Sequence, residues 1–183
     1  KTDSGHRAAI SGQPDIRMKH RRTATVQRIL GLLIAGASLM MLPPLLVSLW
    51  YEDGTASIFL MSAAALLLTG SVIFLPVRNI QEDLRLRDGF LIVAVCWISL
   101  ALVGALPFLL LEQPDISYVD ALFESMSGLT TTGATILTNI DDLPRGILYY
   151  RQQLQWLGGL GIVVLAVAIL PMLRIGGMQL YRA

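Results

Sequence analysis

The stretch GFLIVAVCWISLALVGALPFLLL, residues 89–111, decides the fold class, because it runs for 23 residues without Asp, Glu, Lys or Arg. A helix of this length rises about 1.5 Å per residue and reaches roughly 34 Å. That matches the hydrocarbon core of a bilayer, which is about 30 Å thick. Three more uncharged blocks lie outward along the chain, at Ile29–Trp50, Ala56–Val77 and Gln152–Leu173. The sequence therefore predicts an all-α integral membrane protein with four transmembrane helices.

The overall composition agrees with this interpretation. The chain of 183 residues is 54% hydrophobic and 15% charged, with a mean hydropathy of +0.63. Soluble domains carry about 25% charged residues, so the composition argues against a water-soluble enzyme. The net charge of +1 argues against a nucleic-acid binder. The single cysteine, Cys96, excludes an intrachain disulfide and a cysteine metal site.

The basic residues predict the orientation of the four helices. Of the 14 Lys and Arg residues, seven precede the first block, three lie between the second and third, and two follow the fourth. Alternating crossings place these three segments on one face, which the positive-inside rule makes cytoplasmic. Both termini are therefore expected in the cytoplasm. The opposite loops are acidic, with Glu52, Asp53, Glu112, Asp115, Asp141 and Asp142.

The ends of the chain differ in character. Residues 1–25 are polar and contain Gly5, Gly12 and Pro14, and we expect a flexible cytoplasmic tail there. Because the chain begins at Lys1 rather than Met, we expect it to be a fragment.

The connection between the third and fourth blocks contains a second kind of helix. Ser117–Gly128 has apolar residues at helical spacing. Ser117 and Asp120 have the spacing of a capping box, and Gly128 is expected to end the helix. About eleven residues give roughly 16 Å, half the thickness of a bilayer. Such a helix can enter the membrane but cannot cross it.

The residues after this short helix, LTTTGAT at 129–135, are uncharged and rich in Thr. Irregular backbone at membrane depth is tolerated only inside protein or beside a wet cavity. The pattern predicts a re-entrant pore loop, in which backbone carbonyls replace the water around a monovalent cation. Gly133 permits backbone angles that a Cβ resists. A structural re-entrant loop or a plain outer loop remains the alternative.

Several further residues allow two interpretations. Glu124, in the short helix, either braces that helix or attracts ions, since carboxylates inside membranes are often functional. Asp120 is better explained by its place at the helix start. Arg151 is either an interfacial anchor or a partner of Glu124. Gly158 and its neighbouring glycines indicate close helix packing, because neither a preceding strand nor a following Lys-Ser/Thr suggests a phosphate loop.

The sequence contains no catalytic motif of an intramembrane enzyme. The uncharged blocks contain no His, no His-Glu-x-x-His motif and no pair of Asp residues. Ser125 and Ser127 have no histidine nearby in the sequence to activate them. The chain is therefore predicted not to be an enzyme.

Longer motifs resemble a known family. FESMSGLTTTGAT at 123–135 resembles the first pore loop of the Trk/Ktr/HKT superfamily of cation transporters. QWLGGLGIVVLAVAILP at 155–171 is similar to the helix after that loop, and GGMQLYRA at 176–183 to the cytoplasmic segment beyond it. The resemblance covers roughly residues 26–183.

The resemblance implies an architecture of four linked helix–pore loop–helix repeats around one pore. Residues 26–88 would be an extra helix pair with its cytoplasmic linker, and residues 89–175 the first repeat. Residues 176–183 would lead to a second repeat that is missing here, as are the two after it. It also implies a location in the bacterial inner (plasma) membrane.

The resemblance further implies site residues. Thr131 and Thr132 would bind potassium through their carbonyls, Gly133 would be the selectivity-filter glycine, and Thr130 and Ala134 would flank it. The motif has one glycine, unlike the two of potassium-channel filters, and we expect less strict selectivity.

The implied function is potassium uptake, with K⁺ as the transported ion and no cofactor in this chain. The implied partners are membrane lipid, the three other pore repeats, a second copy in a homodimer, and a cytosolic nucleotide-binding ring of the TrkA kind. The alternative function is that of a non-conducting structural or assembly module of a membrane complex.

Overall fold

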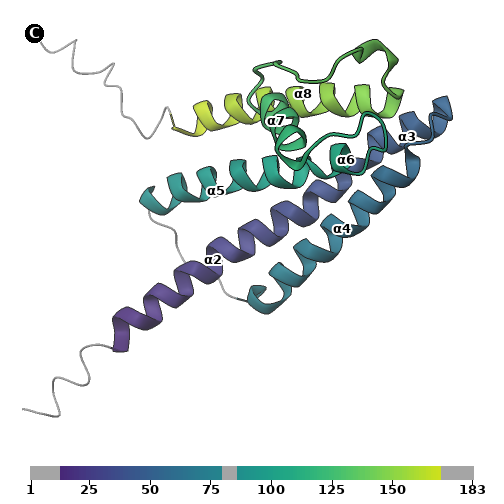
Figure 1. The fold of residues 1–183 in the computed structure, drawn as a ribbon. Coiled ribbons are helices and arrows are strands. Elements are labelled where there is room, and N and C mark those ends of the chain that lie inside the picture. Colours follow the sequence, from purple (N-terminus) through teal and green to yellow (C-terminus); the bar gives the residue numbers. More distant parts are fainter. Residues whose placement is uncertain (1–12, 80–85, 170–183) are drawn as a thin grey trace, which may run out of the picture.

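The computed structural model describes residues 13–79 and 86–169, and within these ranges every regular element is a helix. Figure 1 shows long helices lying beside one another, with the short helix α7 between α5 and α8. The elements are α2 (Gln13–Ala37), η1 (Ser38–Met41), α3 (Leu42–Tyr51), α4 (Ala56–Phe74), η2 (Leu75–Val77), α5 (Leu86–Gly104), α6 (Leu106–Leu109), α7 (Tyr118–Leu129), η3 (Ile140–Asp142) and α8 (Arg145–Ile169).

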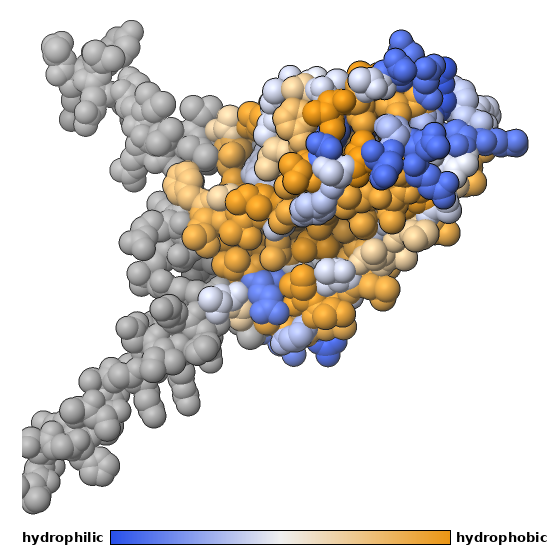
Figure 2. Space-filling view, in the orientation of Figure 1, coloured by the Kyte–Doolittle hydropathy of each residue, from blue (hydrophilic) through white to orange (hydrophobic). Residues whose placement is uncertain are grey.

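Three helical segments of the described residues are long and apolar enough to cross a membrane: Thr23–Tyr51, Ala56–Val77 and Gly89–Leu109. They coincide with three of the four predicted blocks. The fourth block belongs to α8, which begins at Arg145, and its last residues, 170–173, lie outside the described residues. Figure 2 shows apolar side chains over the middle of the bundle and hydrophilic ones gathered around the α3–α4 turn and the α7–α8 connection.

The N-terminal region differs from the expectation of a flexible tail over residues 1–25. Helix α2 begins at Gln13, so residues 13–25 are helical, while residues 1–12 lie outside the described residues. The physical reason is cooperativity, because extending an existing helix costs far less than starting a new one. The membrane-crossing part of α2 provides that existing helix. Pro14, as the second residue, suits a helix start.

The first long segment is interrupted at its middle by η1. Pro43 and Pro44 lack amide hydrogens, so the carbonyls of Leu39 and Met40 lose the donors that an unbroken helix would provide. The tighter η1 turn gives Leu39 a replacement donor, the Leu42 amide. The Met40 carbonyl accepts a hydrogen bond from Gln153 Nε2 of α8 at 2.9 Å. The proline break therefore attaches α8 to the segment formed by α2, η1 and α3.

Helices α2 and α4 pack backbone against backbone. A Cβ added to Gly70 would lie 2.3 Å from the Ala35 amide nitrogen, and one added to Gly31 would lie 2.7 Å from the Phe74 nitrogen. Only glycine permits such an approach. Small residues at helix contacts are the usual basis of close packing in membranes, where lipid removes the hydrophobic drive between helices.

Tyr150 of α8, which is 1% exposed, is buried where α4, α5 and α6 meet α8. Its ring packs against Phe59 of α4 and Phe108 of α6, with ring centroids 5.8 and 5.3 Å apart. Its hydroxyl donates to the carbonyl of Gly104, where α5 ends, at 2.8 Å. The predicted third block is thus broken near Pro107, as expected of a proline near a helix end, and the break is satisfied by Tyr150.

The turn between α3 and α4 is organised by Asp53. One carboxylate oxygen accepts from the Ser48 hydroxyl, from the Thr55 amide at 3.0 Å and from the Thr55 hydroxyl at 2.8 Å. The other oxygen accepts from the Gly146 amide in the first turn of α8 at 2.6 Å. One side chain therefore closes the turn before α4 and caps the first turn of α8, a role that its place in an acidic loop did not reveal.

We predict that Gly70→Ala destabilises the fold by about 1–3 kcal/mol, the usual effect of overpacking a tight contact. The added methyl meets the backbone of Ala35, which cannot move without separating α2 from α4. Thermal unfolding in detergent measures the effect. The matched control is Gly36→Ala, because nothing lies within 4 Å of its added Cβ, and it should unfold at or above the parent temperature. Equal behaviour of the two variants would contradict the packing model.

Acidification should weaken the link made by Asp53. Burial raises the pKa of Asp53, but hydrogen bonds from Gly146, Ser48 and Thr55 outweigh it and hold that pKa below the ordinary value of 3.8. A carboxyl with a lowered pKa stabilises the fold fully above its unfolded pKa, and that contribution is lost as pH falls through the folded value. We expect Asp53→Asn to flatten the acid limb of a plot of stability against pH. Glu52→Gln is the matched control, because Glu52 takes no part in the bonds to Gly146, Ser48 and Thr55.

Candidate functional site

The short helix α7 has the predicted start and a different end. Ser117 Oγ accepts from the Asp120 amide at 3.2 Å, and Asp120 Oδ2 accepts from the Ser117 amide and hydroxyl, which confirms the capping box. The expectation that Gly128 ends the helix was wrong, because α7 continues to Leu129. Gly128 serves packing instead, since a Cβ there would lie 3.0 Å from Leu154 Cβ of α8.

The twelve residues of α7 give a length of about 18 Å, half a bilayer. Figure 1 shows α7 between α5 and α8, with its connection to α8 running back toward the α3 end of the molecule. The segment Thr130–Ala134 follows the C-terminal end of α7 directly. This end carries the negative end of the helix dipole, which favours a cation beside it.

The backbone φ angle alternates between negative and positive values along residues 130–133. Thr130 has a φ of −82°, Thr131 a φ of +58° and Gly133 a φ of +74°. The φ of Thr132, which lies between Thr131 and Gly133, is not positive. Gly133 therefore adopts a backbone conformation that a residue with a Cβ resists, as expected. Thr131 adopts the left-handed region despite its branched Cβ, a conformation that is uncommon for such a residue and that gathers at functional sites.

Hydrogen bonds fold the first residues of the segment back onto α7. The amides of Thr130, Thr131 and Thr132 donate to carbonyls of its last turn at 2.9–3.0 Å. The Ser127 hydroxyl donates to the Ala134 carbonyl at 2.6 Å. These bonds use amide hydrogens and the Ala134 carbonyl, and they fix a loop whose side chains are largely exposed in this chain.

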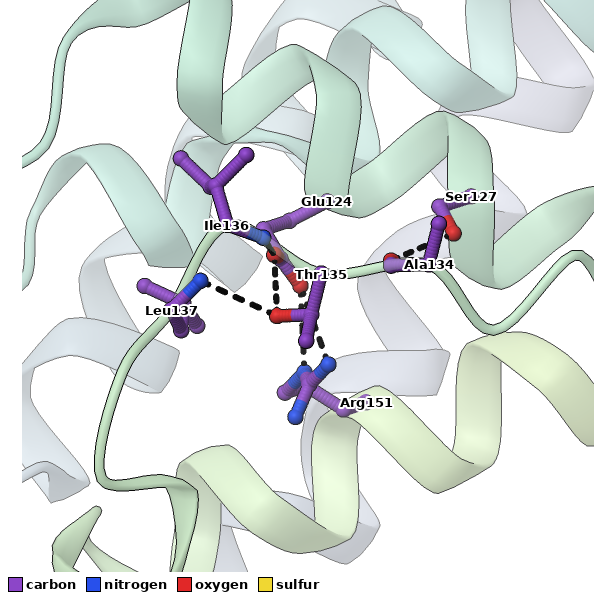
Figure 3. Close-up of polar contacts among 7 residues, drawn as sticks. All are labelled: Glu124, Ser127, Ala134, Thr135, Ile136, Leu137 and Arg151. Carbon is purple, nitrogen blue, oxygen red and sulfur yellow. Dashed lines mark hydrogen bonds and ion pairs between the residues drawn. The ribbon is translucent and has the colours of Figure 1, made fainter.

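Glu124 holds the far end of the segment. Its side chain is 1% exposed, and Oε1 accepts from the Thr135 hydroxyl at 2.5 Å and from the Ile136 amide at 2.8 Å. Its other oxygen accepts from Arg151 of α8, with N–O distances of 3.1 and 3.2 Å. Figure 3 shows Thr135 and Ile136 of the loop and Arg151 of α8 converging on the Glu124 side chain. Of the two interpretations left open for Arg151, the structure selects pairing with Glu124.

Helix α8 also supports the start of the segment. A Cβ added to Gly158 would lie 1.9 Å from the Leu129 carbonyl oxygen, so the backbones of α8 and α7 touch there. The close packing expected of the α8 glycines is confirmed at this contact. Gly133 faces the same helix, because its added Cβ would lie 4.0 Å from Gln155 Nε2.

The structure thus brings together most of the predicted site residues. Thr130, Thr131, Thr132, Gly133 and Ala134 form one loop at the end of α7, and Glu124 braces its continuation. Asp120 lies apart, at the other end of α7, engaged in the cap. Sequence reasoning missed Ser127 and Thr135. The only sequence signal for these two residues was a hydroxyl group in or beside an uncharged loop, whose polar backbone groups needed hydrogen-bond partners within the protein.

The loop at 130–133 offers neutral oxygen atoms as candidate ligands. Across the described part of the chain, no cluster of three or more His, Cys, Asp or Glu residues could hold a metal ion. The oxygens on offer at 130–133 are backbone carbonyls and threonine hydroxyls, the ligands that replace the water of an ion in transit.

Comparison with known proteins identifies the family. Residues 55–183 match the family model TrkH, described as a cation transport protein. The chain belongs to the TrkH family. A Trk system potassium uptake protein TrkH from Halomonas elongata is 57% identical over 157 residues, which cover 86% of this chain and 33% of that protein. The corresponding protein of Escherichia coli K12 is 53% identical over 158 residues, with the same two shares.

A solved member of the TrkH family has the same fold. The crystal structure of the potassium transporter TrkH from Vibrio parahaemolyticus superposes with a TM-score of 0.79 at 52% identity, covering 85% of this chain and 33% of that one. The chain thus spans about a third of the length of the relatives it matches. The chain is that of a bacterial membrane protein, and three helices of its described part are long and apolar enough to cross a membrane. The relatives are named as transporters, in line with the expectation of a non-enzyme.

We predict strong coupling between Glu124 and Arg151. Replacing one member of a buried ion pair leaves an uncompensated charge and costs about 3–5 kcal/mol, whereas replacing both removes that penalty. Glu124→Gln and Arg151→Gln should each lower the free energy of unfolding, and the double variant should lose less than the sum.

The cycle is measured by unfolding in detergent. Arg145→Gln serves as the control, because Arg145 begins the same helix and is exposed. It should not couple to Glu124→Gln. Additive effects of the Glu124 and Arg151 substitutions would show that the ion pair does not brace the loop.

Proposed function

We propose that this chain supplies one of four pore repeats to a transporter that takes up potassium ions. Thr130–Ala134 would be its quarter of the selectivity filter, with Thr131 and Thr132 as the principal ligands through their carbonyls. The observation that carries the proposal is the alternating backbone of 130–133 at the negative end of a half-membrane helix.

The alternation has a direct consequence for ion binding. Successive residues of opposite hand turn successive peptide groups to one side, as they do in the nests that bind anions through amides. The amides of Thr131 and Thr132 point back to α7, where they donate to its carbonyls. Each of these amides shares its peptide group with the carbonyl of the preceding residue, so the carbonyls of Thr130 and Thr131 point to the opposite side, where they are available to an ion.

Conduction requires the remainder of the ring. One chain of this length offers a single filter segment, and a cation stripped of water needs oxygens from all around it. We infer that three further repeats complete the pore, and that residues 26–88 are an extra helix pair outside it. In this proposal α8 is the fourth membrane crossing, and the basic segments lie in the cytoplasm.

The partners follow from the same proposal. The relatives are named as parts of a Trk system. We infer that the complete protein forms a homodimer and binds a cytosolic nucleotide-binding ring. The predicted cytoplasmic segment 176–183 lies outside the described residues.

Gly133→Ser tests the filter assignment. A Cβ in the left-handed region costs about 1–2 kcal/mol, so the loop should relax and spread its carbonyls. In proteoliposomes of the complete transporter, we expect the ratio of K⁺ to Na⁺ entry to fall. Gly36→Ser is the control, because it makes the same chemical change in open space on α2.

The possible outcomes separate the two functions. Selective K⁺ entry that is lost in Gly133→Ser and kept in Gly36→Ser supports the filter. Unchanged selectivity in Gly133→Ser removes Gly133 from the filter. Absence of K⁺ entry in the parent favours the alternative of a non-conducting structural module.

A further inference from the structure

The carboxylate of Asp53 lies at the meeting point of the extra helix pair and the pore repeat. Besides the Ser48 and Thr55 bonds that close its own turn, it accepts the Gly146 amide from α8 at 2.6 Å. This bond joins two segments far apart in the sequence. It is also charge-assisted, and such bonds are about twice as strong as neutral ones.

The first turn of α8 packs tightly against the α3–α4 turn. A Cβ added to Gly146 would lie 2.8 Å from Thr55 Oγ1, 2.9 Å from the Phe59 ring and 3.1 Å from Ser48 Cβ. Close packing prevents α8 from moving toward the turn, and the Asp53 bond prevents it from moving away. The axial position of α8 is therefore fixed at its outer end.

The same helix carries both supports of the filter loop. Arg151 lies about 8 Å along α8 from Gly146, and Gly158 about 18 Å, at 1.5 Å per residue. Arg151 pairs with Glu124, which holds the loop after Ala134, and Gly158 touches the Leu129 carbonyl just before Thr130. A shift of α8 displaces both ends of the loop together.

We propose that Asp53 is a positioning residue for the selectivity filter, acting through α8, and that the extra helix pair is part of the filter's scaffold. This inference rests on the proposed function. It assigns a role in ion discrimination to a turn that touches neither the ion nor the filter loop.

A competing hypothesis is that acidic residues of this turn merely attract cations to the outer mouth. Glu52 separates the two hypotheses, because it neighbours Asp53, carries the same charge and is exposed, yet takes no part in the bonds to Gly146, Ser48 or Thr55. Attraction would depend on both carboxylates, whereas positioning depends on Asp53 alone.

The test uses the complete transporter in proteoliposomes, with initial K⁺ and Na⁺ entry measured at one imposed membrane potential. Asp53→Asn removes the charged acceptor, and Glu52→Gln is the matched control. Gly146→Ala provides a second, independent variant, because it pushes the first turn of α8 off the α3–α4 turn and keeps both carboxylates. Thermal unfolding of each variant is followed in parallel.

We expect the K⁺:Na⁺ ratio to fall about fivefold in Asp53→Asn, equivalent to about 1 kcal/mol of discrimination. Gly146→Ala should change it in the same direction, and Glu52→Gln should match the parent. If Asp53→Asn does not fold, Gly146→Ala decides alone.

Folded variants with the selectivity of the parent would overturn the inference, as would an equal fall in Glu52→Gln. A parent that does not discriminate K⁺ from Na⁺ would overturn the proposed function, and the inference with it.

Discussion

The arrangement around the loop at residues 130–136 depends on the interactions of the buried Glu124 carboxylate. Backbone that is neither helix nor sheet can lie at membrane depth only if protein satisfies its polar groups, because each unpaired group costs several kcal/mol there. Glu124 accepts the Ile136 amide and the Thr135 hydroxyl, and Arg151 balances its charge. Because Arg151 belongs to α8, the loop can have this shape only while α8 stands beside α7. The ion pair thus couples the conformation of the loop to the packing of a helix.

The absence of water in the bilayer core also accounts for the polar contacts at the breaks in the long helices. A break in a helix leaves carbonyls without donors, and in a bilayer these carbonyls need partners from other elements. Gln153 provides one for Met40, and Tyr150 provides one for Gly104. Both donors come from α8. These two breaks therefore each add a polar attachment to α8. Such bonds specify how the helices pack, whereas apolar side chains are equally compatible with lipid.

Glycines decide how near the helices come. At Gly158 and Gly70 a neighbouring backbone occupies the place of a side chain. Contacts of this kind are stiff, because a backbone cannot rotate away as a side chain can. A loop supported by the Leu129–Gly158 contact therefore keeps its position to within small displacements, as the proposed selectivity filter requires.

The sequence by itself determined the membrane class, three of the spans, the capping box of α7 and the location of the loop. These depend on properties of short segments: uninterrupted apolar length, the Ser117–Asp120 spacing, and a Thr-Gly run too polar to cross. It also indicated Gly133, because a glycine within a run of threonines marks a backbone position that a Cβ would strain. Only the tertiary structure decided that Arg151 pairs with Glu124, that Gly128 packs rather than terminates, and that Asp53 caps α8. Each of these depends on which distant segment lies opposite a residue, and local propensity and spacing carry no information about that.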